Sequence, residues 1–137
     1  MKKHPLSQIS SKDPVESNPS RASIKQQAQA SYERKWHLNP EQFDASRNAL
    51  GRDRLQKTWD LIQKHFDLQE KKVADLGCGS GEIAKKLQQA GASIDVVDIA
   101  SQPLALLKEV STTHQAYVTH TPLKDGEYDH VVSTEVI

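Results

Sequence analysis

The 137-residue sequence has one cysteine and no excess of charge of either sign. A single cysteine cannot form a disulfide within the chain, and its scarcity favours a reducing compartment. The 18 basic and 18 acidic side chains give a formal charge of zero, so nothing electrostatic points to nucleic acid or an anionic membrane as a partner. From these shortages we expect a cytoplasmic protein that binds no nucleic acid.

Long apolar runs are also missing. No stretch approaches the run of about 18 apolar residues that suggests a membrane-spanning helix. No apolar stretch follows the basic start at residues 1–3, which argues against a secretory signal and leaves an organelle transit peptide open. The six histidines show neither His-x3-His spacing nor pairing with cysteine, so we expect no metal site.

Hydrophobic patterning divides the chain into three parts. Residues 1–22 carry almost no large apolar groups, which predicts a disordered tail. Residues 23–70 predict a helical cap, with helices at 23–36, 40–43 and 51–65, and the last carries an apolar stripe. Three aromatic residues in this part could pack on the core or cover an acceptor pocket. The stripe is Leu55, Trp59, Ile62 and Phe66, and the aromatic residues are Tyr32, Trp36 and Phe43.

Residues 71–137 alternate between strand-like and helix-like segments. We predict strands from residue 73, at 94–98, at 115–119 and at 128–136. We predict helices at 82–89, ended by Gly91, and from 101 onward, capped by Ser101. A strand–helix–strand–helix–strand order followed by a further strand predicts an α/β domain with a doubly wound parallel sheet.

The first strand of this domain runs into a glycine-rich loop. Asp75 ends the apolar run, and Gly77, Gly79 and Gly81 follow at alternate positions before a helical pattern begins. Glycine tolerates the backbone conformations of such a sharp turn and permits close approach of a ligand. The turn aims backbone N–H groups and a helix N-terminus at whatever lies above the strand.

A second acid supports a nucleotide-like ligand. Asp98 ends the next strand, where a carboxylate can accept both hydroxyls of a ribose. The glycine spacing is G-x-G-x-G, whereas the dinucleotide fingerprint is G-x-G-x-x-G. Gly81 therefore comes one residue too early for a nicotinamide- or flavin-dependent oxidoreductase, which stays as an alternative.

Residues 75–81, D-L-G-C-G-S-G, together with residues 94–99, resemble the first two motifs of class I S-adenosylmethionine-dependent methyltransferases. The resemblance implies a Rossmann-like sheet with strand order 3-2-1-4-5-7-6, of which residues 73–137 would supply strands 3-2-1-4. It covers about residues 73–137 and is looser at 128–135. We therefore expect an incomplete α/β domain at 71–137, from a truncated product or an incomplete gene model, with a true half-domain as the alternative.

The resemblance also implies the cofactor, S-adenosylmethionine, and the residues that bind it. Asp75 would hold the methionine amino group, and Asp98 the ribose hydroxyls. Relatives often carry an acid after strand three that binds the adenine amino group, and residues 117–121 contain none. The full set implied is Asp75, Gly77, Cys78, Gly79, Gly81, Asp98, Ile99 and Thr134, with Cys78 a small buried filler, Ile99 against the adenine and Thr134 beside the reacting methyl.

The implied reaction is methyl transfer to a small-molecule acceptor. Residues 90–94 and 101–104 are similar to small-molecule methyltransferases, and come closest to the 3-demethylubiquinone O-methyltransferase group. The hydroxyl of a quinone precursor is therefore the expected acceptor. The sequence names no catalytic base. A non-catalytic, cofactor-binding fragment is the alternative from a different class.

Overall fold

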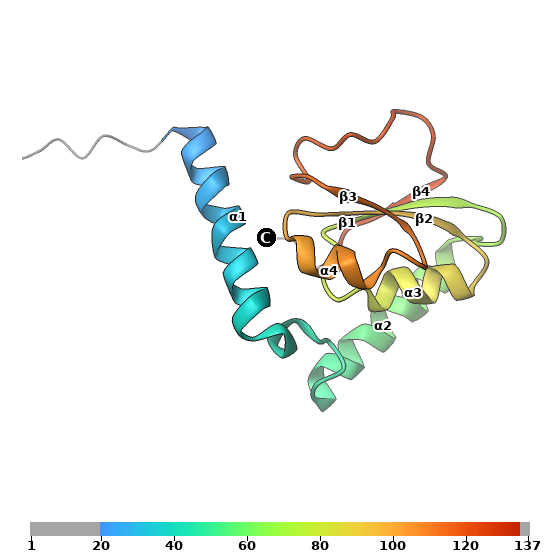
Figure 1. The fold of residues 1–137 in the computed structure, drawn as a ribbon. Coiled ribbons are helices and arrows are strands. Elements are labelled where there is room, and N and C mark those ends of the chain that lie inside the picture. Colours follow the sequence, from blue (N-terminus) through green and yellow to red (C-terminus); the bar gives the residue numbers. More distant parts are fainter. Residues whose placement is uncertain (1–19, 135–137) are drawn as a thin grey trace, which may run out of the picture.

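The computed structural model describes residues 20–134, and these form a parallel sheet with helices against one face (Figure 1). The strands are β1 (Lys72–Leu76), β2 (Ser93–Asp98), β3 (Thr112–Gln115) and β4 (His130–Val132). The helices are α1 (Arg21–Leu38), η1 (Pro40–Phe43), α2 (Ala49–His65), α3 (Glu82–Gln89) and α4 (Ser101–Leu106).

The sheet has the order β3-β2-β1-β4, with every neighbouring pair parallel. This confirms the predicted α/β class and the order 3-2-1-4. Helices α3 and α4 are the connections between β1, β2 and β3, and they lie on the same face as α2 (Figure 1). The connection from β3 to β4 contains no helix and passes over the other face. The carboxyl ends of β1 and β2 therefore lie next to each other at one edge of the sheet.

The core lies between the sheet and its helices. Strands β1 and β2 contribute Val73, Ile94 and Val96, and α3 contributes Ile83, Ala84 and Leu87. Trp59 and Ile62 of α2 belong to the same cluster, and Leu55 and Phe66 pack against it, so the predicted stripe of α2 is confirmed. Burial of such apolar side chains stabilises the fold by about 1.5–3 kcal/mol each.

Helix ends follow local signals in part. Asn48 caps α2 by accepting a hydrogen bond of 2.8 Å from the Gly51 N–H, and the helix begins two residues before the predicted start. Helix α3 has the predicted bounds, and Gly91 follows its C-cap with φ 94°. Ser101 was predicted as the cap of α4 and is instead its first residue, because Ala100 occupies the N-cap position.

Two predicted strands differ from the structure. The third was predicted at 115–119 and lies at Thr112–Gln115, where it pairs with β2 from Asp95 to Asp98. The fourth was predicted at 128–136 and covers His130–Val132, while residues 135–137 lie outside the described part. Residues 1–19 of the predicted tail also lie outside it, and α1 begins at Arg21, inside the predicted disordered region.

Candidate functional site

The glycine loop after β1 is tied to the end of β2. The N–H groups of Gly77 and Cys78 both donate to the carbonyl of Val97, at 2.7 and 3.2 Å. Gly77, Gly79 and Gly81 have φ of 74°, 54° and 84°, in the left-handed region that side chains disfavour. The positive φ values confirm the prediction that this turn requires glycine.

Gly79 and Gly81 differ in what surrounds them. A Cβ at Gly81 would lie 2.4 Å from Cδ2 of Leu107, a fully buried residue after α4, so Gly81 permits close packing between α3 and the end of α4. A Cβ at Gly79 would meet nothing within 4 Å. The space above Gly79 is open, and a ligand can approach the loop backbone there.

Asp75 is the buried acid of the site. Its residue is 1% exposed, and neither of its carboxylate oxygens has a hydrogen-bond partner among the described residues. Burial, followed by the nearby charge of Asp98, raises its pKa from 3.8 to about 7. An unpartnered carboxylate in this position is costly, and a bound cationic group would offset the cost.

Asp98 is held by the backbone around it. Oδ2 accepts from the Gly79 N–H at 3.2 Å, and Oδ1 accepts from the Ala100 N–H at 2.9 Å. Partial burial raises the pKa of Asp98, these backbone donors oppose the shift, and Glu33 adds to it. A carboxylate has about four lone-pair positions, so Asp98 can accept further hydrogen bonds while it fixes the loop.

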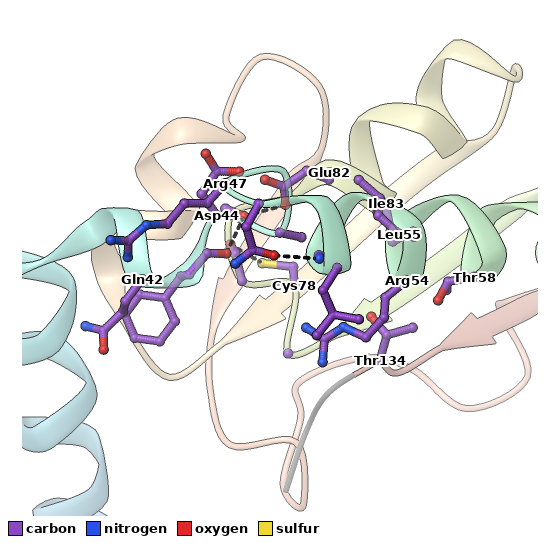
Figure 2. A pocket seen from close by; sticks show the side chains of 18 residues that line it. Gln42, Asp44, Arg47, Arg54, Leu55, Thr58, Cys78, Glu82, Ile83 and Thr134 are labelled. Atoms are coloured by element: carbon purple, nitrogen blue, oxygen red, sulfur yellow. Dashed lines mark hydrogen bonds between the residues drawn. The ribbon is translucent and has the colours of Figure 1, made fainter.

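A cavity of about 430 Å³ lies between the glycine loop and the segment that leads into α2 (Figure 2). Four of the residues implied for the cofactor line it, namely Gly77, Cys78, Gly79 and Thr134. Asp75, Gly81, Asp98 and Ile99 do not line it. Asp75 lies under the loop and Asp98 at its β2 side, so the implied set extends along the edge of the sheet from this cavity.

The N-terminal helices supply cavity residues that the sequence did not single out. Arg54, Leu55 and Thr58 extend from α2 toward the cavity, and Arg54 lies near Thr134 in Figure 2. Their spacing of three and four residues continues to Gly51 and Leu50, which also line the cavity. Arg54 and Thr58 flank the apolar stripe of α2, and this helical spacing is the signal that the sequence contains. The spacing alone does not indicate that this side of the helix faces a cavity.

The aromatic residues of the cap divide between packing and the cavity. Trp36 is 4% exposed, and its ring stacks on the Phe43 ring with the two centroids 4.4 Å apart. The ring centroid of Tyr32 lies 6.4 Å from that of Phe43. Phe43 also lines the cavity, and its carbonyl lies 3.0 Å from the Ser80 hydroxyl in the glycine loop. The cap and the loop are thus joined beside the cavity.

Cys78 faces this cavity as a half-buried thiol (Figure 2). Burial, with the charges of Asp75 and Asp98, raises the pKa of Cys78 and keeps its sulfur protonated at neutral pH. A protonated thiol is a poor nucleophile. Among residues 20–134 no cluster of three metal-ligating side chains occurs, and none of their helices is long and apolar enough to cross a membrane.

Comparison with known proteins identifies the α/β part. A family model described as a methyltransferase domain matches residues 74–137. A ubiquinone biosynthesis O-methyltransferase of Cronobacter sakazakii is 29% identical over 75 residues, which cover 49% of this chain and 31% of that protein. The chain therefore spans less than a third of the length of this curated relative.

Solved structures show the same fold. Phosphoethanolamine N-methyltransferase 1 of Haemonchus contortus, in complex with phosphoethanolamine and S-adenosylhomocysteine, matches with a TM-score of 0.65 and 16% identity over 83% of this chain and 26% of that one. The PH0226 protein of Pyrococcus horikoshii matches with a TM-score of 0.58 and 21% identity over 72% and 49%. Residues 74–137 thus carry the matched methyltransferase domain, and the strand order and the D-x-G-x-G-x-G loop are similar to those of the class I S-adenosylmethionine-dependent methyltransferases, whose cofactor is S-adenosylmethionine.

Proposed function

We propose that the protein that contains this chain transfers the methyl group of S-adenosylmethionine to a small-molecule acceptor, with the hydroxyl of a quinone precursor as the preferred acceptor. The observation that carries the proposal is Asp75, a buried carboxylate with both oxygens unpartnered below an open glycine loop. S-adenosylmethionine supplies an electrophilic methyl group on a sulfonium ion. The residues described above then have to bind and orient it.

The site residues fit the groups of this cofactor. The methionine ammonium would offset the buried charge of Asp75, and the ribose hydroxyls would use the remaining lone pairs of Asp98. The open side of Gly79 lets the methionine part lie against the loop backbone. Ile99, which is half-buried next to Asp98, would offer an apolar surface to the adenine. Gly77, Gly81 and Cys78 shape the loop, and Thr134 borders the cavity in which the methyl would lie.

Arg54 extends this set. The cofactor also carries a carboxylate, and Arg54 brings a guanidinium into the cavity that holds Gly77 and Gly79. An arginine binds a carboxylate with two parallel hydrogen bonds, which would fix the methionine end. The cap therefore supplies part of the cofactor site, in addition to any part in acceptor binding.

The acceptor is proposed from the remaining cavity surface. Leu50, Leu55 and Ile83 offer apolar contacts, and Thr58 offers a hydroxyl. Such a surface suits an aromatic ring with a hydroxyl group, and the name of the Cronobacter sakazakii relative supports a quinone precursor. Methyl transfer of this type depends largely on holding the acceptor oxygen in line with the methyl carbon. The balanced charge of the chain supports a small molecule over nucleic acid as the acceptor.

The test begins with calorimetric titration of the folded chain by S-adenosylhomocysteine. We expect micromolar binding that Asp98→Ala abolishes and that the exposed control Asp125→Ala leaves unchanged. NAD titrated in parallel should not bind. Transfer of a labelled methyl group to a hydroxylated aromatic quinone precursor then tests the acceptor. A cooperatively folded chain that binds no S-adenosylhomocysteine contradicts the proposal, and binding without transfer to any aromatic hydroxyl restricts the function to cofactor binding.

A further inference from the structure

A single side chain of α1 connects this helix to the segment that follows β2. Glu33 accepts two hydrogen bonds from Ser101, from its backbone N–H at 2.8 Å and from its hydroxyl at 3.0 Å. It accepts a third from the side-chain amide of Gln115 at 3.2 Å. These partners lie 68 and 82 residues away in sequence, so the contacts hold together distant parts of the chain.

The side-chain amide of Gln115 also connects Glu33 to the residues proposed to bind the adenosine. Gln115 Nε2 also donates to the carbonyl of Ile99 at 3.1 Å, and the next residue, Ala100, donates its N–H to Asp98. Glu33 and Gln115 therefore hold the segment of residues 98–101 from outside, through Ser101 and the Ile99 carbonyl. This short segment carries both residues proposed for the adenosine part of the cofactor, Asp98 and Ile99.

Helix α1 is held against the domain mainly through polar groups. Trp36 is the only buried residue of the helix, and it packs beside η1. Farther along the helix, Gln29 accepts a hydrogen bond of 3.2 Å from the Tyr117 hydroxyl, and Lys25 lies 5.1 Å from the centre of the Tyr117 ring. Figure 1 shows α1 standing beside the end of α4 and away from the sheet. Partly exposed polar contacts of this kind open more easily than an apolar core.

We infer that Glu33 is a positioning residue for cofactor binding: by holding Ser101 and Gln115 it fixes residues 98–101 in the geometry that receives the adenosine, and it docks α1 as a cover over that end of the site. The inference rests on the proposed function for its ligand. It adds a residue outside both sequence motifs and a role for the helix in front of the domain. Binding of the adenosine and docking of α1 then favour each other, because both require the same arrangement of residues 98–101.

The charge of Glu33 gives the inference a second measurable consequence. Glu33 on α1, Asp75 on β1 and the Cys78 thiol in the glycine loop surround Asp98, and the Glu33 charge contributes to the raised pKa of Asp98. Removing that charge lowers the pKa of Asp98. When the pH series is measured with Asp75→Asn present in every variant, so that the Asp75 slope is removed, the remaining acid-side loss of affinity reports Asp98 ionisation. Loss of the Glu33 charge then moves that limb to lower pH, a shift that a purely structural contact would not produce.

The experiment compares wild type, Glu33→Ala, Glu33→Gln and the control Gln27→Ala, which changes an exposed side chain on the same helix. Hydrogen exchange of the Ser101 amide is measured without ligand, and the affinity for S-adenosylhomocysteine is measured from pH 5 to pH 8. Charge-assisted hydrogen bonds of this kind predict an exchange rate and a dissociation constant each raised about fivefold to tenfold in Glu33→Ala. Glu33→Gln keeps one acceptor oxygen, so its exchange rate and dissociation constant should lie between those of wild type and Glu33→Ala. Its acid-side loss of affinity should move to lower pH. Gln27→Ala should match wild type.

The outcomes separate the two proposals. Equal affinity and equal Ser101 exchange in Glu33→Ala and Gln27→Ala overturn the inference, and leave the methyltransferase proposal standing. A loss of affinity accompanied by a loss of the cooperative melt also counts against it, because Glu33 would then stabilise the fold as a whole. Failure of folded wild type to bind S-adenosylhomocysteine refutes the proposed function itself.

Discussion

Asp75 should destabilise the ligand-free protein as the pH rises, and replacing it with asparagine should remove that effect. The carboxyl group has a pKa of about 7 in the folded chain and 3.8 as its reference value. The folded state therefore keeps a proton that the unfolded state has already lost between these two values. Stability contributed by the protonated form is lost as the pH rises from about 3.8 to 7, and above this window the loss is complete.

The size of the effect follows from the pKa difference. A shift from 3.8 to about 7 corresponds to a cost of about 4 kcal/mol at pH 8, of which somewhat more than a third is already present at pH 5. The asparagine side chain has nearly the same shape and no charge at any pH. The free energy of unfolding of Asp75→Asn, relative to wild type, should therefore increase by about 3 kcal/mol between pH 5 and pH 8.

Urea unfolding at half-unit steps of pH measures this difference. Any fixed cost of burying the amide is the same at each pH and cancels when the pH values are compared. The exposed residue Asp125 provides the matched control, since Asp125→Asn should follow wild type at every pH. A difference between Asp75→Asn and wild type that stays constant from pH 5 to pH 8 would refute the reasoning, because Asp75 would then ionise alike in both states.

Four further predictions concern the glycine loop, Arg54 and the ligand. In wild type the affinity for S-adenosylhomocysteine should fall about tenfold per pH unit below pH 7, since Asp75 must ionise to bind an ammonium, and calorimetry should find no such slope in Asp75→Asn. Gly81→Ala should destabilise the fold by about 3 kcal/mol, because it adds a clash with Leu107 to the strain of a positive φ. Gly79→Ala adds only backbone strain, about 1 kcal/mol, because nothing lies within 4 Å of the new methyl group. That methyl group enters the ligand space, so Gly79→Ala should weaken the binding of S-adenosylhomocysteine more than Gly81→Ala does. Equal effects of the two substitutions on ligand affinity and on the melting temperature would contradict this difference. Arg54→Gln should lower the affinity for S-adenosylhomocysteine about tenfold and leave the affinity for adenosine unchanged. A loss of affinity for both ligands would argue against contact between Arg54 and the methionine carboxylate.

The elements that the sequence predicted well are those whose signals are local. The glycines of the loop are required by their own backbone conformation, and the bounds of α3 follow from Gly81 before it and Gly91 after it. The stripe of α2 has helical periodicity because one face packs on the core. The order of strands came from resemblance to a family, and the pairing of β1 with β2 and β4 confirms it.

Strand β3 was misplaced because its signal is not local. It is one of the two edge strands of the described sheet, with the sequence Thr-Thr-His-Gln, and none of its residues is fully buried. The apolar residues Tyr117 and Val118 just after it suggested a strand, but they lie in the connection to β4. The register of β3 is set by pairing with Asp95–Asp98, and partner-determined pairing leaves little trace in a short polar segment.

The same reasoning explains which half of the site was missed. Asp75 and Asp98 belong to β1 and β2, so their meeting at one edge follows from the strand order alone. Arg54 and Glu33 reach the site only through the docking of α2 and α1, and no spacing along the chain encodes that docking. The two halves also differ in charge: Asp75, Asp98 and Glu33 gather around the expected adenosine and ammonium positions, while Arg54 lies in the neighbouring cavity.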